Sequence, residues 1–231
     1  MIEVDLVQSS VRELNQRLHR IGPGDNEHNW EQYWRVVNPN GAHAIAVGLT
    51  VPVHVEIKGH VGYYCAGMNA SAEVVVDGHA GTGLAENIMS GSVRVRGNAA
   101  QSAAASGRGG LVVIEGDASA RCGISMKGVT IVVGGSVGHM SAFMGHAGTL
   151  VVCGDAEHDL GDSIYEADVF VAGKVASLGA DCMEKEMTSA DFDRLADLLD
   201  RAQIAADLRR FRRHGSARRL YNFQNDHAAE Y

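Results

Sequence analysis

The sequence predicts an all-β solenoid: a right-handed parallel β-helix of about seven 19-residue coils, with an N-terminal cap and a C-terminal α-helix. The first observation is a segment of the form apolar-x-apolar-x-Gly, which recurs every 19 residues without insertion or deletion. Its structural glycines are Gly59, Gly78, Gly97, Gly116, Gly135, Gly154 and Gly173. A fixed period of this size is typical of solenoids, in which each repeat stacks on the next. Right-handedness follows the usual preference of strand–crossover–strand connections.

The second observation is the composition of the columns that the repeat creates. Four residues and two residues before each glycine, every coil carries Val, Ile or Leu. Alternation at period two with β-branched residues predicts a strand. Two residues after the glycine only Val or Ala occurs, and seven residues after it only Ala or Gly. These small residues predict a narrow interior, and each glycine predicts a corner that needs a positive φ or a close approach of backbones.

Residues 1–50 are predicted to cap the open end of the solenoid, which occupies residues 51–181. Residues 2–6 have the pattern of a strand, Ser10 and Glu13 match a capping box at the start of a helix, and residues 44–47 suggest a further strand. A cap is expected because an uncovered coil is an exposed sheet edge. The alternative is a docking surface for a partner, with Trp30 and Trp34 as anchors.

Residues 182–231 are predicted to form a helix and a basic tail. Thr188 or Ser189 is the expected N-cap, and an apolar face follows at helical spacing: Phe192, Leu195, Leu198, Leu199 and Ile204. Six arginines come next: Arg209, Arg210, Arg212, Arg213, Arg218 and Arg219. They suggest either a solvated tail or a partner-docking arm with Phe211, Tyr221 and Phe223 as anchors, and RNA binding is a third alternative.

One outward column predicts an interface. Three residues before the glycine, the last four coils carry apolar side chains: Val113, Val132, Val151 and Phe170. A contiguous apolar stripe on a face that should meet water usually marks a contact surface. We expect either the C-terminal helix or a partner subunit to cover this stripe.

Composition restricts the classes of partner. The net charge of −8 argues against a general nucleic-acid or membrane binder. The chain has no apolar run of 18 residues, and its first residues lack the pattern of a signal peptide. We therefore expect a cytoplasmic protein that neither spans a membrane nor binds nucleic acid.

The sequence predicts no catalytic residue, no metal site and no cofactor site in this chain. Cys65, Cys122, Cys153 and Cys182 form no Cys-x-x-Cys pair, so free thiols are expected and an iron–sulfur cluster is not. The best metal candidates are His60 with His79 and His139 with His158, pairs that should stack in adjacent coils. Neither pair has an evident third ligand, so surface turn histidines are the simpler interpretation.

Residues 116–135, with the sequence GDASARCGISMKGVTIVVGG, resemble the repeat of the GXGXG domain that ends large glutamate synthases. The repeat is also similar to the C subunit of formylmethanofuran dehydrogenase. Residues 178–187, LGADCMEKEM, look like the stand-alone GXGXG subunit of N-methylglutamate synthase. The resemblance spans about residues 40–187 and is specific for the superfamily, whereas the choice among its members depends on this short tail and on chain length.

The resemblance implies a non-catalytic scaffold subunit in a hetero-oligomeric complex that converts methylamine and glutamate to N-methylglutamate and ammonia. It implies two partners, an amidotransferase-like subunit and a synthase subunit that carries FMN and an iron–sulfur cluster. Two alternatives stay open: the C subunit of a formylmethanofuran dehydrogenase or formyltransferase/hydrolase complex, and a self-assembling structural β-helix. A bound pterin cofactor would indicate the first alternative, and a homo-oligomer as the sole native form would indicate the second.

Overall fold

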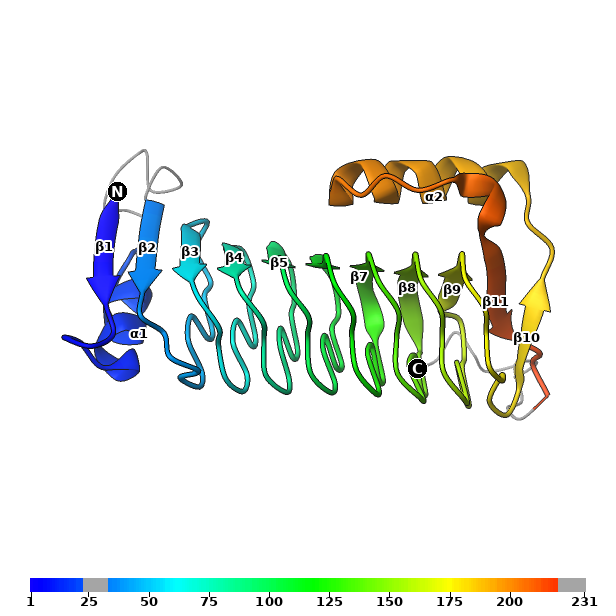
Figure 1. Cartoon of the computed structure of the whole chain (residues 1–231), viewed down its shortest axis with the longest axis horizontal. Coiled ribbons are helices and arrows are strands. Elements are labelled where there is room, and N and C mark those ends of the chain that lie inside the picture. The colour runs from blue at the N-terminus through cyan, green and yellow to red at the C-terminus, as the bar shows by residue number, and fades with distance from the viewer. Residues whose placement is uncertain (23–32, 220–231) are drawn as a thin grey trace, which may run out of the picture.

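The structure is a computed structural model that describes residues 1–22 and 33–219. It is a long rod made of stacked coils, and each coil contributes one strand to a common sheet (Figure 1). The predicted solenoid is confirmed. The strands are β1 (Ile2–Asp5), β2 (Tyr33–Val37), β3 (His54–Lys58), β4 (Glu73–Asp77), β5 (Ser92–Val95), β6 (Leu111–Ile114), β7 (Lys127–Val133), β8 (Ala147–Val152), β9 (Asp168–Val171), β10 (Cys182–Lys185) and β11 (Arg212–Ser216). The helices are α1 (Val11–His19), α2 (Ser189–Ala202) and a short 3-10 turn at Leu208–Arg210.

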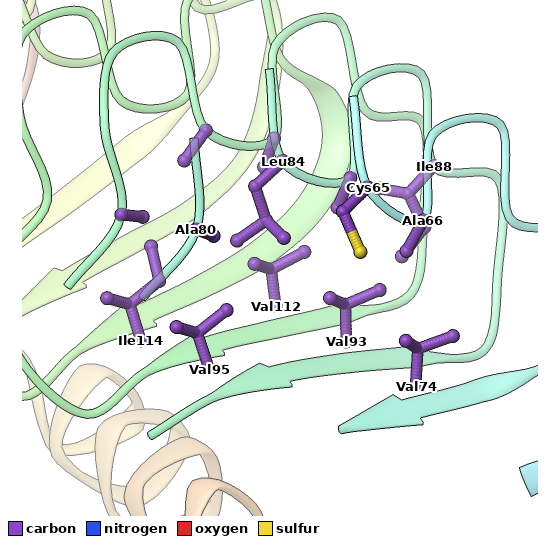
Figure 2. Packing of buried hydrophobic residues seen from close by; sticks show 14 of the residues in the cluster. Cys65, Ala66, Val74, Ala80, Leu84, Ile88, Val93, Val95, Val112 and Ile114 are labelled. Atoms are coloured by element: carbon purple, nitrogen blue, oxygen red, sulfur yellow. The ribbon is translucent and has the colours of Figure 1, made fainter. Parts of the chain in front are cut away.

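The 19-residue period fixes the register of the parallel strands. Val55 pairs with Val74, and Val74 pairs with Val93, so equivalent residues of successive coils lie side by side from β3 to β9. A second ladder of single bridges joins the small residues two positions after each glycine, from Val61 to Val175. The inward side chains form straight rows, such as Val74, Val93 and Val112 beside Val95 and Ile114 (Figure 2). These rows make one continuous core along the rod.

The structural glycines are required by a close approach of neighbouring coils. Among the seven structural glycines only Gly59 has a positive φ, at +131°, and the six from Gly78 to Gly173 do not. A Cβ atom built on Gly78 would lie 2.6 Å from both the carbonyl carbon and the carbonyl oxygen of Gly59. The alternative that the sequence left open, a positive φ at every structural glycine, is therefore wrong for this column.

The left-handed corners lie elsewhere in the coil. Residues five, seven and nine positions after the glycine adopt φ near +55° in successive coils, as Ser102, Ala104 and Ser106 illustrate with +59°, +56° and +56°. In the middle position Ala104 is also fully buried. A small side chain tolerates both the left-handed backbone and the confined interior. Tyr64 and Met68 adopt the same positive φ at exposed positions, so burial, not the left-handed backbone, restricts the middle column to Ala or Gly.

The N-terminal segment extends the sheet beyond the periodic coils. Strand β2 pairs in parallel with β3 at an offset of 21 residues, Trp34 with Val55, and β1 pairs in parallel with β2. The predicted strand at residues 44–47 is wrong, because Ala44 and Ala46 both have φ of +56° and lie in a corner. Helix α1 begins at the predicted capping box and buries Leu14 and Leu18 against the core.

The C-terminal end of the sheet reverses direction. Strand β11 pairs antiparallel with β9, and β10 pairs antiparallel with β11, so a segment from the end of the chain lies between two earlier strands. Helix α2 precedes β11 and lies along the rod above β6 to β9 (Figure 1). Its N-cap is Thr188. The Thr188 hydroxyl accepts the Asp191 N–H and the Asp191 carboxylate accepts the Thr188 N–H, which makes a capping box. The sequence did not predict β11.

Candidate functional site

The apolar stripe of the last four coils is covered by the chain itself. Val113, Val132, Val151 and Phe170 are at most 2% exposed and form a second core with residues of α2. Leu195, Leu198 and Leu199 supply the helical side of this core. Ile204 packs against it from beyond the end of the helix, and Phe192 is only partly buried. The sequence predicted that either the C-terminal helix or a partner subunit covers this stripe, and the structure shows that the helix does. These four residues are therefore not a free surface for a partner.

The helix ends where the stripe ends. The same outward column carries Arg94 one coil before Val113, and the Arg94 Nη2 atom donates a hydrogen bond of 2.7 Å to the carbonyl oxygen of Ala202. A cation at a helix C-terminus satisfies an unpaired carbonyl group and interacts favourably with the helix dipole. A helix of 14 residues is about 21 Å long, which matches roughly four sheet spacings, the separation of β6 from β11 in the strand order.

Before Arg94 the outward column carries Val75 and then Glu56, so the apolar stripe does not continue beyond Arg94 as an unbroken row. Glu56 is 7% exposed and lies between Arg35, at 3.2 Å, and Lys58, at 2.7 Å. The hydrogen bond from Lys58, with those from Tyr33 and Arg35, outweighs the effect of burial and lowers the pKa of Glu56 to about 2. The carboxylate is therefore ionised at neutral pH. This part of the face is held by ion pairs, and none of the helices of the described residues lies over it (Figure 1).

The arginine-rich segment is mostly part of the fold. Four of the six arginines form ion pairs within the chain: Arg209 with Asp207, Arg212 with Glu184, Arg213 with Asp168 and Asp191, and Arg218 with Glu166. The prediction of a solvated tail or a docking arm is wrong for residues 212–216, which form β11 inside the sheet. Phe211 is 3% exposed and belongs to the core under α2. Arg210 and Arg219 are exposed, and Tyr221 and Phe223 lie outside the described residues.

Of the two tryptophans proposed as anchors, only Trp34 lies within the described residues. It is 4% exposed in the N-terminal core, and the guanidinium of Arg17 lies 4.9 Å from the centre of its ring. Trp34 is thus a core residue and not a docking anchor. Trp30 lies outside the described residues.

The outward column that contains His60 and His79 is a ladder of hydrogen bonds. At each step the side chain of one coil accepts a bond from the backbone N–H of the equivalent residue in the next coil. The six bonds run through His60, His79, Asn98, Asp117, Ser136, Asp155 and Lys174, with lengths between 2.7 and 3.0 Å. The sequence offered two members of this column, His60 and His79, as metal candidates, and the structure assigns the whole column a structural role.

This ladder also determines which ring nitrogen of His60 and His79 carries the proton in the neutral side chain. The rings of His60 and His79 stack with their centres 4.8 Å apart, as predicted. Each Nδ1 atom accepts a backbone N–H, so in the neutral ring the proton is on Nε2. His139 and His158 are not among the stacked ring pairs in the described ranges, and Nδ1 of His158 lies 3.3 Å from the Ser177 hydroxyl. Residues 1–22 and 33–219 hold no group of three or more His, Cys, Asp or Glu side chains placed to bind a metal ion.

A test of the ladder is to replace Asn98 with Ala. The substitution removes the oxygen that accepts the Asp117 N–H at 2.9 Å, and this site is exposed to water. We expect the free energy of unfolding to fall by about 1 kcal/mol, as for one net hydrogen bond. The measurement is urea denaturation followed by circular dichroism, with Asn98→Asp as the control because aspartate keeps the acceptor oxygen. Equal losses in the two variants would show that the bond is not the source of stability.

The four cysteines are free thiols, as predicted. Burial raises the pKa of Cys65 and Cys122 to about 12, of Cys153 to about 11 and of Cys182 to about 12. A thiol with such a pKa is protonated at neutral pH, and the thiolate is the nucleophilic form. These residues are therefore structural.

One buried histidine, His214 in β11, has no hydrogen-bond partner for its Nδ1 atom in the described structure. Burial lowers the pKa of this side chain, so it is neutral at pH 7.

An exposed apolar patch that the repeat pattern does not predict lies at one corner of the first two periodic coils. Tyr63, Tyr64, Met68 and Met89 are between 45% and 57% exposed. Tyr64 and Met68 line a shallow cavity of about 350 Å³ together with Val47. Their positions, four to eleven residues after the glycine, carry mainly small or polar residues in the other coils, so the period gave no reason to single them out. We name Tyr63, Tyr64, Met68 and Met89 the corner patch.

The comparisons with known proteins identify one curated relative. Protein GlxC of Rhizobium meliloti (strain 1021) is 58% identical over 230 residues, which cover 99% of this chain and 99% of the relative. No protein-family profile matches the chain, and no solved structure matches it. In the described residues no helix has the length and apolar character to cross a membrane. With this identity along its full length and with its 19-residue glycine repeat, the chain belongs to the GlxC family, a family of the GXGXG type.

Proposed function

We propose that this chain is a non-catalytic scaffold subunit of a glutamate-synthase-like complex in the cytoplasm. The observation that carries the proposal is the corner patch, which leaves two tyrosines and two methionines exposed on a rigid, hydrogen-bonded rod. Contiguous exposed apolar residues mark surfaces for protein partners, and methionine and tyrosine are enriched in such interfaces. The side chains with the most reactive chemistry, by contrast, are engaged in the fold: the stacked histidines in the ladder and the thiols in apolar surroundings.

The complex that we propose is N-methylglutamate synthase, which joins methylamine and glutamate to give N-methylglutamate and ammonia. The GXGXG type of the family supports a glutamate-synthase relationship, and residues 178–187 support the methylamine version through their resemblance to its stand-alone subunit. In this proposal the chemistry belongs to an amidotransferase-like subunit and to a subunit with FMN and an iron–sulfur cluster. The contribution of this chain is positioning, which raises the effective concentration of one reacting group near another.

The experiment is affinity purification of the tagged chain from its native host, followed by identification of the accompanying proteins and an assay with methylamine and glutamate. We expect a flavin- and iron-containing subunit and an amidotransferase-like subunit, and methylamine-dependent formation of N-methylglutamate. A bound pterin or formyl-transfer activity would replace this proposal with the formylmethanofuran dehydrogenase alternative. Recovery of this chain alone would favour the self-assembling β-helix.

The corner patch supplies the matched variants for this experiment. Tyr64 and Met68 both have positive φ, at 59° and 56°, so Asn replaces either side chain without a new backbone conflict. We expect the double variant Tyr64→Asn, Met68→Asn to recover at least tenfold less partner protein than the wild-type chain. Ser125→Asn is the control, because Ser125 occupies the same column as Met68 three coils further along and has φ of 53°. Equal recovery of partner protein with both variants would show that the corner patch does not bind the partner.

A further inference from the structure

A second cavity lies at the C-terminal end of the sheet, where β11 separates β9 from β10. Its volume is about 380 Å³, within the range of pockets that hold small molecules. The charged residues in its lining are Glu166, Asp168, Lys185, Arg213 and Arg218. Three cations and two carboxylates give this cavity a net charge of +1, on a chain whose net charge is −8. The cavity is therefore a local positive site on an acidic protein.

The two carboxylates in the lining are already neutralised by partners. Asp168 accepts hydrogen bonds from Arg213 at 2.8 Å and from Arg194 at 2.7 Å. Glu166 accepts one from Arg218 at 2.8 Å. Arg213 also reaches Asp191 at 3.4 Å, behind the cavity wall. Adding Arg194 and Asp191 to the five charged lining residues leaves four cations against three carboxylates, so the surplus of one positive charge persists.

Lys185 supplies this surplus charge. Its ammonium group makes no hydrogen bond and no ion pair with any of the described residues, although its side chain is partly buried. The Nη2 atom of Arg213 likewise makes no hydrogen bond with a described residue, since the bonds of that guanidinium to Asp168 and Asp191 use Nε and Nη1. An ammonium and a guanidinium with unused donors, both facing one cavity, favour an anion with two oxygen acceptors.

The space for such an anion exists because residue 215 is glycine. A Cβ atom built on Gly215 would find its nearest heavy atoms at 3.7 Å, the Ala167 oxygen, and at 3.8 Å, two carbons of Lys185. These are ordinary contact distances, and the φ of Gly215 is not positive. The backbone therefore accepts a side chain here, and any side chain larger than Ala would occupy the cavity beside Lys185.

We propose that this cavity binds a small organic carboxylate, held by Lys185 and Arg213 above the open position at Gly215. A monocarboxylate carries one negative charge, which matches the surplus of +1, whereas a phosphate dianion carries about two. Its two oxygens suit one ammonium donor and one guanidinium edge. The inference is independent of the scaffold proposal, because the corner patch lies on the first two periodic coils and this cavity lies at the other end of the rod.

The test is a ligand-observed NMR titration of the full-length chain with butyrate at constant ionic strength. Butyramide is the matched probe, because it has the same size without the charge. We expect butyrate to bind with a Kd on the order of 1 mM or below and butyramide to bind at least about tenfold more weakly. Inorganic phosphate is the third probe, and binding of phosphate as tight as that of butyrate would overturn the carboxylate assignment.

Three variants separate the cavity from general charge effects. Lys185→Gln removes the surplus cation and breaks no hydrogen bond or ion pair with the described residues, and Gly215→Val fills the space without changing any charge. Both should weaken butyrate binding at least about tenfold. Arg210→Gln is the control, because Arg210 is exposed at the same end of the rod but does not line this cavity. Butyrate binding that is absent in the wild type, or unchanged in both cavity variants, would overturn the proposal.

Discussion

Replacing Val132 with Asp is expected to lower the free energy of unfolding by about 4 kcal/mol or more. Val132 is fully buried at the centre of the core between α2 and the sheet, with Val113 and Val151 on either side. A carboxylate at this place would lose its hydration, and the apolar cluster offers it no compensating cation. The helix would have to move away to hydrate the charge, which would expose the whole stripe.

The control for this prediction is Val75→Asp in the same outward column. Val75 lies beyond the end of α2, between Glu56 and Arg94, and it belongs to neither hydrophobic core. Val75 is 9% exposed, and a carboxylate there would have Arg94 on one side and Glu56, already paired with Arg35 and Lys58, on the other. Because a cation is adjacent and no helix has to be displaced, we expect a loss less than half as large. The measurements are urea denaturation and binding of a dye that reports exposed apolar surface. Equal losses in the two variants would show that α2 does not stabilise the stripe in solution.

Replacing Gly78 with Ala is the second large effect, and we expect a loss of at least about 3 kcal/mol. The added Cβ would lie 2.6 Å from two backbone atoms of Gly59 and 2.8 Å from the backbone nitrogen of His60. Backbone atoms cannot rotate away as a flexible side chain can, so the two coils must separate. Separation would lengthen the hydrogen bonds between β3 and β4, and in a stacked structure the damage passes to both neighbours.

Gly215→Ala is the matched control for the glycine prediction. It adds the same methyl group to a glycine of the same sheet, at a position where the nearest atoms are 3.7 Å away or more. We expect this variant to change the free energy of unfolding by less than about 1 kcal/mol. Thermal and urea denaturation of both variants would check the difference. If Gly78→Ala proved as stable as Gly215→Ala, close packing of the coils would not explain the glycine column.

The sequence alone determined the solenoid and its register, because both depend on a repeated pattern. Parallel coils of equal length place residues 19 positions apart side by side, so identical columns in the sequence become identical rows in the structure. The starts of both helices were also predictable, since a capping box is a local arrangement of Ser10 with Glu13 and of Thr188 with Asp191. Periodic and local patterns need no knowledge of distant contacts.

The left-handed corners show where sequence patterns were ambiguous. The column of Ala and Gly predicted confinement, and Ala104 is fully buried, but the column gave no sign of its positive φ, which Tyr64 and Met68 adopt with large side chains. Ala44 and Ala46 lie in an equivalent corner of the first coil, where alternating apolar residues mimicked a strand. That coil escaped the repeat analysis because its offset from β3 is 21 residues instead of 19.

Only the tertiary structure decided what lies over the stripe and what forms the end of the rod. The apolar column predicted a cover, but α2 and a partner subunit satisfy the same pattern equally well. Strand β11 has no counterpart in the repeat, and its insertion between β9 and β10 brings Lys185, Arg213 and Gly215 together around one cavity. Contacts of this kind join segments that share no period, such as Asp168 with Arg213, 45 residues apart, and Glu166 with Arg218, 52 residues apart. Such contacts form only when distant segments come together in the folded chain. Neither the spacing of residues nor the composition of one segment therefore predicts them.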